Sequence, residues 1–332
     1  MILDKIVFRC DANKVSGFGH FKRCMQVAAL LNCEPIFFGD YNNTALTILN
    51  SNRLKYVKTS EFNSQQIKIL KGILEDNIHL IIVDSYLADK NYYENLNKHK
   101  LKWGVFDDYN NYNYEGSEFV LNFRLNAEKI YTYITKHSML GVDYMPVEDS
   151  LTKLRTVNET TDINDEIQNI LVFIGSSDIY EISLSLASAI NECYPNIKID
   201  IILGDDHYHK LREINFPYIG IHRMRSDVDK LMMHADLIIS GGGKFKYESC
   251  YSLTPTMVYS QTEGEYDDSI MFSKNKLIID CGLAKDFNKD ILLTKLGVYS
   301  NRYERNKLKM NCLNTFNKNG NQNIINKINS IL

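Results

Sequence analysis

The sequence lacks three features that would place the protein outside the cytoplasm or on nucleic acid. No apolar run approaches the roughly 20 residues that a membrane span requires, and the N-terminal residues lack the apolar core of a signal peptide. The seven cysteines form no CxxC pair, which argues against a disulfide framework and a zinc site. The formal net charge is -3, so no basic excess can neutralise a phosphate backbone. We therefore expect a cytoplasmic protein with no stable membrane insertion, no nucleic-acid partner and no metal.

The chain length predicts two domains, because 332 residues are too many for one ordinary hydrophobic core. Strand and helix patterns alternate through residues 1–125 and again from Ile170 onward, as in parallel doubly wound sheets. From Val147 to Ile167 the sequence is polar and loses its periodicity, so we place the interdomain connection there. The predicted fold class is α/β, with one domain at 1–150 and a second at 165–332 that includes the C-terminal helices.

Apolar periodicity predicts the individual strands and helices. A helix is expected over His20–Leu31, where apolar residues recur along one face. Residues 207–209, a His-Tyr-His run, are expected to form a surface loop, and a late strand is expected at 277–280. Buried strands are expected at 6–10, 79–85 and 170–174, of which 79–85 is the clearest in the first half. Further strands are expected at 197–203 and 237–239.

Three glycine- or serine-rich loops follow predicted strands, namely Gly17-Phe18-Gly19, Gly175-Ser176-Ser177 and Ser240-Gly241-Gly242-Gly243. Glycine lets backbone N–H groups approach an anion, and a following helix N-terminus adds a favourable dipole. We expect phosphate to bind there, in a cleft between the carboxyl ends of the two sheets. A glycine after a strand is also a common turn device. Neither GxGxxG nor GxxxxGK[ST] is present, which disfavours Rossmann-fingerprint dinucleotide binding and Walker-type ATPase activity.

His20 opens a predicted helix directly after a glycine turn, and two roles fit this position. A helix N-terminus disfavours the imidazolium form, so the ring would be available as a general base. Alternatively, the ring bonds a backbone group and is structural. Arg23 lies three residues on and either holds an anionic or polar substrate or is solvated. The carboxylates of Asp84 and Asp107-Asp108 end predicted strands, where they either contact a ligand or cap the next turn.

Several of these residues together resemble the N-terminal motif of a nucleotide-sugar hydrolase family. The family is UDP-2,4-diacetamido-2,4,6-trideoxy-β-L-altropyranose hydrolase of pseudaminic acid biosynthesis, with its spore-coat polysaccharide relatives. Its pattern, roughly RxDxSxxIGxGHxxRC, is matched from Arg9 to Cys24 except at Asn13 and Ser16. Later segments resemble further family motifs: Ile82–Tyr86, Phe106–Asp108, Leu121-Asn122 with Ala127 and Tyr131, Leu140-Gly141 with Tyr144, Gly175–Asp178, and Ala235–Pro255 including Glu248.

The resemblance implies the GT-B fold, two Rossmann-like domains facing across a cleft, and hydrolysis of a nucleotide-activated sugar. Water would attack the anomeric carbon with inversion and UDP would leave, without metal or cofactor, in nonulosonic (pseudaminic-type) acid biosynthesis. It places the catalytic base at His20, a sugar contact at Tyr86 and a ribose contact at Glu248. The predicted substrate-binding residues are Arg9, Asp11, Gly17, Phe18, Gly19, Arg23, Asp84 and Tyr86. The predicted nucleotide-binding residues are Gly175, Ser176, Ser177, Ser240, Gly241, Gly242, Gly243, Lys244 and Glu248.

The chain departs from the family pattern mainly in its second half. Lys244-Phe245 stands where the family has Ser or Thr, and Lys244 would pair with phosphate as a point charge. The family's Asn-Gln pair has no clear counterpart, and Gln261 or Glu265 are the nearest candidates. Two alternatives therefore stay open. One is a GT-B glycosyltransferase in which His20 deprotonates an acceptor hydroxyl, and the other is a sugar-nucleotide-binding protein without catalysis. We expect a nucleotide sugar as the partner and a monomeric chain.

Overall fold

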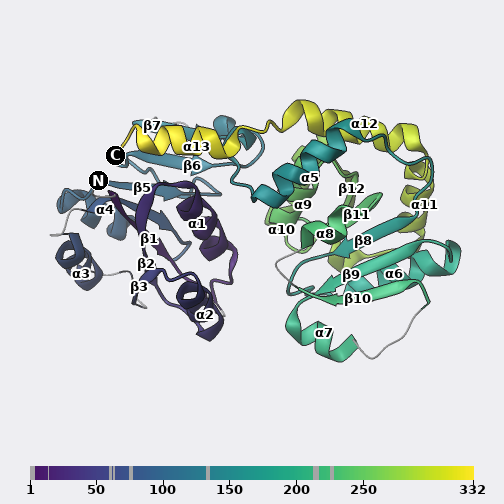
Figure 1. Cartoon of the computed structure of the whole chain (residues 1–332), viewed down its shortest axis with the longest axis horizontal. Coiled ribbons are helices and arrows are strands. Elements are labelled where there is room, and N and C mark those ends of the chain that lie inside the picture. Colours follow the sequence, from purple (N-terminus) through teal and green to yellow (C-terminus); the bar gives the residue numbers. More distant parts are fainter. Residues whose placement is uncertain are drawn as a thin grey trace. The chain divides into compact units, whose positions relative to one another are not determined.

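The protein consists of two compact units, each built around one parallel β-sheet with helices packed on it (Figure 1). The structure is a computed structural model that describes residues 4–13, 15–59, 62, 64–74, 78–131, 135–211, 217–224 and 228–332. Unit 1 comprises Met1–Val147 and Lys318–Leu332, and unit 2 comprises Glu148–Asn317. Among the described residues, no helix combines the length and apolar character that a membrane span requires.

Unit 1 has a seven-stranded sheet in the order β3-β2-β1-β4-β5-β6-β7, and all its strand pairs are parallel. Its core packs buried side chains such as Val7, Ile81 and Trp103 against Tyr92 and Leu96. The strands are β1 (Asp4–Cys10), β2 (Cys33–Gly39), β3 (Lys55–Lys58), β4 (Ile78–Asp84), β5 (Trp103–Phe106), β6 (Phe119–Asn122) and β7 (His137–Leu140). The helices are α1 (Gly19–Leu30), α2 (Asn43–Ser51), α3 (Ser64–Leu74), α4 (Lys90–Lys98), α13 (Gly320–Asn329) and the 3-10 turns η1 (Ala127–Lys129) and η2 (Val142–Tyr144).

The strand order of unit 1 reverses between β1 and β4, which are neighbours in the sheet although far apart in sequence. Their register pairs Cys10, the last residue of β1, with Asp84, the last residue of β4. Since α1 follows β1, its first residues lie at the same sheet edge as the end of β4. In open parallel sheets, ligands bind at this carboxyl edge where the strand order reverses.

Unit 2 repeats the architecture with six parallel strands in the order β10-β9-β8-β11-β12-β13, so its reversal point lies between β8 and β11. Ile-rich strands form its core with α6 and α11. The strands are β8 (Asn169–Phe173), β9 (Lys198–Leu203), β10 (Ile219–Arg223), β11 (Leu237–Gly241), β12 (Thr256–Ser260) and β13 (Ile279–Leu283). The helices are α5 (Asp149–Thr160), α6 (Ile182–Cys193), α7 (Asp205–Leu211), α8 (Val228–Met232), α9 (Lys244–Tyr251), α10 (Glu263–Lys274), α11 (Lys289–Tyr299), α12 (Arg302–Thr315) and the 3-10 turn η3 (Ala284–Asp286).

The first boundary between the units lies between Val147 and Glu148, within the stretch from Val147 to Ile167 that was predicted to be the interdomain connection. Most of that stretch is not a linker, because it forms helix α5 of unit 2. The helix buries Leu151, Leu154 and Arg155. The Arg155 guanidinium donates hydrogen bonds to the backbone carbonyls of Tyr251 (2.9 Å) and Phe316. One of its three buried positions is therefore charged, so the sequence shows no continuous apolar stripe.

The C-terminal helix α13 also differs from the expected division, because it packs with unit 1 and not with the second domain. Figure 1 shows it in yellow beside β7. Its buried residues are Gly320, Ile324 and Ile328. Asn321 bonds the backbone of Val147 twice, accepting from its N–H at 3.0 Å and donating to its carbonyl at 2.9 Å. Such long-range contacts leave no local signal in the sequence.

Smaller differences concern short or polar elements. Residues 207–209 lie inside α7 instead of a loop, and the strand expected at 277–280 is β13, which begins at Ile279. Neither α10 nor β7 was predicted. Helix α10 buries Asp268, Ser269 and Phe272, so two of its three buried side chains are polar. An apolar-periodicity criterion cannot detect such a helix.

Candidate functional site

His20 is positioned by a turn that the Asn13 side chain builds just before α1. The Asn13 carboxamide oxygen accepts from the backbone N–H groups of Val15 and Ser16, both at 2.9 Å. Gly17 follows with φ of 67°, a left-handed conformation that glycine adopts without strain. Helix α1 then begins at Gly19, after Phe18, so that His20 is the second helical residue and is 8% exposed.

His20 belongs to a chain of four polar side chains in unit 1. Its Nδ1 lies 2.6 Å from Oδ1 of Asp84, at the end of β4. Arg23, one turn further along α1, donates to both oxygens of the same carboxylate at 2.8 and 2.6 Å. Arg23 also donates to both oxygens of Asp108 at 2.6 and 3.2 Å. The first three were predicted as site residues, and the structure brings them together.

The charges in this cluster fix the form in which the His20 ring binds Asp84. Burial alone raises the pKa of the Asp84 carboxyl, but the Arg23 guanidinium and then His20 lower it from 3.8 to about 2. Arg23 likewise lowers the pKa of Asp108 against the effect of burial. An ionised carboxylate only accepts hydrogen bonds, so Nδ1 of His20 must carry the hydrogen. Its Nε2 has no hydrogen-bond partner among the described residues and can therefore accept a proton.

The same cluster can also stabilise His20 after it takes up a proton. Asp84 and Asp108 contribute two negative charges and Arg23 one positive charge, so a protonated imidazole makes the four-residue group neutral. Such a carboxylate behind an imidazole holds the ring in place and stabilises the cation formed during proton transfer. The arrangement is therefore suited to general-base chemistry at Nε2.

Two tyrosines extend the His20 cluster toward solvent. The Tyr86 hydroxyl donates to Asp108 at 2.6 Å, and its ring meets the His20 ring edge-on with 4.4 Å between centroids. The ring of Tyr109 lies 5.6 Å from that of Tyr86. Tyr86 was a predicted sugar contact, whereas Tyr109 and Asp108 were not among the predicted site residues. The Asp107-Asp108 pair was noted at a strand end, but spacing could not show which of its members faces Arg23.

Arg9 and Asp11, also predicted to bind substrate, are 0% and 2% exposed. Arg9 donates to Asp11 at 2.6 Å, and its guanidinium carbon lies 3.7 Å from the centre of the Phe62 ring. Asp11 also accepts from the backbone N–H of Asp40 at 2.8 Å and from the Ser85 hydroxyl at 3.3 Å. Through these contacts the pair joins the carboxyl ends of β1, β2 and β4.

In unit 2 the two predicted glycine loops come together at the reversal point of the sheet. The loop Gly175-Ser176-Ser177 follows β8, and the loop from Ser240 to Gly243 ends β11 and caps α9. A Cβ atom on Gly241 would lie 1.9 Å from the carbonyl oxygen of Ile174, so only glycine allows this approach. The two loops are thus packed closely against each other, and the second leads into the N-terminus of α9, a position that favours anions in general.

The charged and polar residues Lys244, Glu248 and Gln261 beside these loops already have protein partners. Lys244 lies 3.3 Å from Glu248, so the predicted phosphate and ribose contacts form an ion pair with each other. Gln261 donates to the Ile174 carbonyl at 3.1 Å and accepts from the Ile179 N–H at 2.7 Å. Gln261 therefore fastens the loop after β8, which is a structural role.

A buried lysine, which was not predicted from the sequence, is connected to the glycine loop through two serines. Lys246 is 0% exposed and donates to Asp268 at 2.9 Å and to Ser269 at 3.0 Å. Ser269 in turn bonds Ser260 at 3.0 Å, and a Cβ on Gly242 would lie 2.7 Å from the Ser260 hydroxyl. Lysine on a helix is usually solvated, so its burial could not be predicted from residue type.

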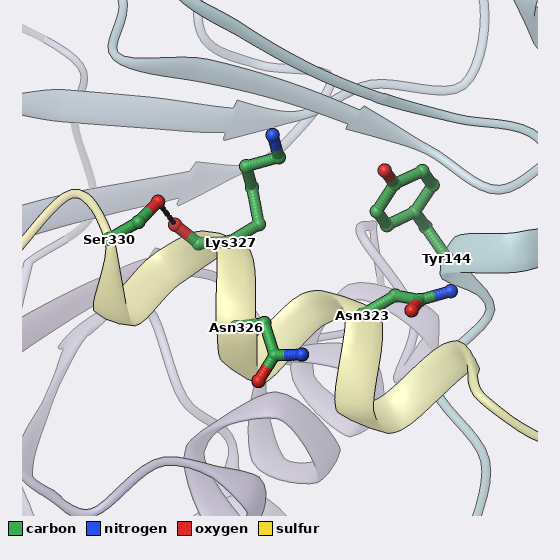
Figure 2. A pocket seen from close by; sticks show the side chains of 5 residues that line it. All are labelled: Tyr144, Asn323, Asn326, Lys327 and Ser330. Carbon is green, nitrogen blue, oxygen red and sulfur yellow. Dashed lines mark hydrogen bonds between the residues drawn. The ribbon is translucent and has the colours of Figure 1, made fainter.

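A small polar pocket lies apart from these predicted residues. It has a volume of about 240 Å³ and lies at the C-terminal helix of unit 1. Figure 2 shows that Asn323, Asn326 and Lys327 come from α13, that Ser330 directly follows the last residue of this helix, and that Tyr144 comes from η2. The Ser330 hydroxyl bonds the backbone carbonyl of Lys327 at 2.7 Å. None of the predicted site residues lines this pocket.

Comparison with known proteins reveals distant relatives. No protein-family model matches the chain. An uncharacterized protein of Methanocaldococcus jannaschii is 24% identical over 283 residues, covering 80% of this chain and 58% of that protein. A second relative, from Helicobacter pylori, is 23% identical over 289 residues, which cover 84% of this chain and 49% of that protein. It is named pseudaminic acid cytidylyltransferase and UDP-2,4-diacetamido-2,4,6-trideoxy-β-L-altropyranose hydrolase. The chain thus spans about half the length of the curated relatives it matches.

Solved structures establish the fold. A spinosyn rhamnosyltransferase complexed with thymidine diphosphate superposes with a TM-score of 0.66 at 11% identity, covering 98% of this chain and 100% of that one. The UDP-GlcNAc 2-epimerase of Neisseria meningitidis, bound to UDP-GlcNAc, gives 0.64 at 13% identity with coverage of 98% and 100%. These likenesses confirm the predicted fold class, which is two Rossmann-like α/β domains of the GT-B type.

Proposed function

We propose that the protein is an enzyme that hydrolyses a nucleotide-activated sugar, with His20 as the base for the attacking water. The observation that carries the proposal is the His20–Asp84 hydrogen bond of 2.6 Å, which leaves Nε2 as a proton acceptor beside the partly exposed ring of Tyr86. Supporting observations are the GT-B fold and two structural neighbours, a rhamnosyltransferase complexed with thymidine diphosphate and a UDP-GlcNAc 2-epimerase bound to UDP-GlcNAc.

The proposed reaction needs one proton transfer in unit 1. A water oxygen attacks the anomeric carbon while Nε2 of His20 takes its proton, and the bond from that carbon to the diphosphate oxygen breaks. The sugar leaves with a new hydroxyl group and the nucleotide leaves as the diphosphate. Asp84 stabilises the resulting imidazolium, and Arg23 holds Asp84 in place.

We further propose that unit 2 binds the nucleotide through the loops at Gly175–Ser177 and Ser240–Gly243. Backbone N–H groups there and Lys244 can pair with the diphosphate charges. The ion pair of Lys244 with Glu248 would then open, freeing Glu248 to accept from the ribose hydroxyls. Glycine is required at Gly241, because a side chain there would collide with the Ile174 carbonyl and separate the two loops.

The proposed substrate is a UDP-linked diacetamido-trideoxyhexose in nonulosonic acid biosynthesis. This proposal draws on the sequence motif around His20 and on the printed name of the Helicobacter pylori relative. A glycosyltransferase is the second candidate, favoured by the rhamnosyltransferase neighbour that matches 98% of the chain. His20 would then deprotonate an acceptor hydroxyl in place of water.

The discriminating experiment is incubation with UDP-sugars in the absence of any acceptor. Hydrolysis predicts prompt release of UDP and free sugar, and His20→Asn should lower kcat by about 10²–10⁴ because the general base is lost. Release that requires an added acceptor would establish transfer instead. Binding without turnover in the wild type, both with and without an added acceptor, would overturn both enzymatic proposals.

A further inference from the structure

Tyr109 is an aromatic side chain that remains exposed beside the His20 cluster. It is 48% exposed and its neighbour Tyr86 is 55% exposed, whereas most large aromatic side chains of unit 1 are buried. The Tyr109 and Tyr86 rings are 5.6 Å apart at 45°, and the Tyr86 ring stands 4.4 Å from that of His20. The two rings thus form a continuous aromatic surface that ends at the imidazole.

The turn that carries Tyr109 is held by a single buried carboxylate. Asp107 is 5% exposed and accepts from the backbone N–H groups of Tyr109 at 3.4 Å and of Asn110 at 2.8 Å. The hydroxyl groups of Tyr114, at 2.9 Å, and of Tyr131 donate to the same carboxylate. Four donors on one side chain fix the backbone from which the Tyr109 ring projects.

The ring itself is held by a cation. The guanidinium carbon of Arg124 lies 5.0 Å from the centre of the Tyr109 ring, a cation–π contact. Arg124 also donates from Nη1 to the backbone carbonyl of Asp108 at 3.0 Å, which ties this cation to the same turn. An exposed aromatic side chain that is already ordered loses little conformational freedom when a ligand binds it, which favours recognition.

We propose that Tyr86 and Tyr109 form an aromatic platform for the sugar and that Tyr109 selects sugars with deoxy or N-acetyl substituents. The inference rests on the proposed function and adds Tyr109 to the same site as a residue that determines sugar specificity. A methyl group or C–H face gains by leaving water against an aromatic ring. A hydroxyl group in the same place would lose its water partners, because the ring face offers it no comparable hydrogen bond.

The test uses calorimetry to compare the dissociation constants of UDP-GlcNAc and UDP-glucose. The two differ only in that an acetamido group in UDP-GlcNAc replaces a hydroxyl group of UDP-glucose. The wild type should bind UDP-GlcNAc more tightly, and Tyr109→Ala should reduce that preference by about 10-fold, the equivalent of 1.4 kcal/mol. Tyr109→Phe keeps the ring and should keep the preference. Tyr303→Ala is the matched control, because Tyr303 is also an exposed tyrosine in a cation–π contact, but in unit 2. It is 66% exposed, and the Lys307 Nζ atom lies 4.2 Å from the centre of its ring.

The outcomes separate this inference from the proposed function. An unchanged preference in a folded Tyr109→Ala protein, or no preference in the wild type, overturns the platform. Either result leaves hydrolysis intact if the wild type still releases UDP. Conversely, a wild type that shows the preference but releases no UDP from a UDP-linked diacetamido-trideoxyhexose supports the platform and overturns hydrolysis. The melting temperature of each variant confirms folding before affinities are compared.

Discussion

Replacing Asp84 by Asn removes the carboxylate on which the His20 tautomer depends. In the native cluster its two oxygens accept one hydrogen bond from His20 and two from Arg23, at 2.6–2.8 Å. A carboxamide offers one acceptor and one donor in the same space. Where its NH₂ group faces His20, Nδ1 must become the acceptor and Nε2 then carries the hydrogen. The ring in that tautomer cannot take a proton from water.

The expected loss in kcat for Asp84→Asn is about 10²–10⁴, which corresponds to roughly 3–5 kcal/mol of transition-state stabilisation. UDP release from a saturating UDP-sugar measures kcat, and thermal melting measures how much stability the folded variant retains. Asp108→Asn is the matched control: it also removes a charge beside Arg23 but keeps the His20–Asp84 bond, so we expect a loss of only about 10-fold. A folded Asp84→Asn protein with kcat within threefold of the wild type would refute the tautomer argument.

Three further predictions concern stability and binding. The pKa of the Asp84 carboxyl is lowered in the folded protein, so its ionised form contributes about 2 kcal/mol to the free energy of unfolding. This contribution is complete above pH 4 and is lost as the pH falls toward 2. Urea unfolding across this pH range should therefore show a steeper loss of stability for the wild type than for Asp84→Asn. Arg155→Met should destabilise unit 2 by about 2–4 kcal/mol because two buried carbonyls lose their donor, whereas the exposed Lys153→Met should cost under 0.5 kcal/mol in the same urea assay. Lys244→Ala should weaken UDP binding about 10-fold by calorimetry without lowering the melting temperature appreciably, since its side chain is 28% exposed; an unchanged affinity would exclude Lys244 from the phosphate site.

The sequence predicted the architecture well where the signal is local. Buried apolar strands alternate with helices in both units, and helix α1 begins at the glycine turn before His20, as expected. Strands that are buried on both faces carry continuous apolar runs, which periodicity detects directly. Helix α5 was not predicted, because one of its buried residues, Arg155, is charged and interrupts the apolar pattern. Its burial depends on the hydrogen bonds that it donates to the carbonyls of Tyr251 and Phe316, which lie far away in the sequence.

The candidate site was only partly predictable, because its defining contacts join distant segments. His20 and Asp84 are 64 positions apart, and Arg23 and Asp108 are 85 apart. They meet because β1 pairs with β4 and β4 with β5, and no spacing rule encodes that pairing. The motif resemblance identified His20 and Asp84 separately, but the bond between them emerges only from the fold.

The central claim is that water attacks the anomeric carbon under the control of His20. Turnover of a UDP-sugar in water enriched in ¹⁸O tests it most directly, with the released UDP analysed by mass spectrometry. The account predicts UDP without ¹⁸O, since the bond broken lies between the sugar carbon and the diphosphate oxygen, and a loss of this release in His20→Asn. Incorporation of ¹⁸O into the UDP, or undiminished release by His20→Asn, would contradict it.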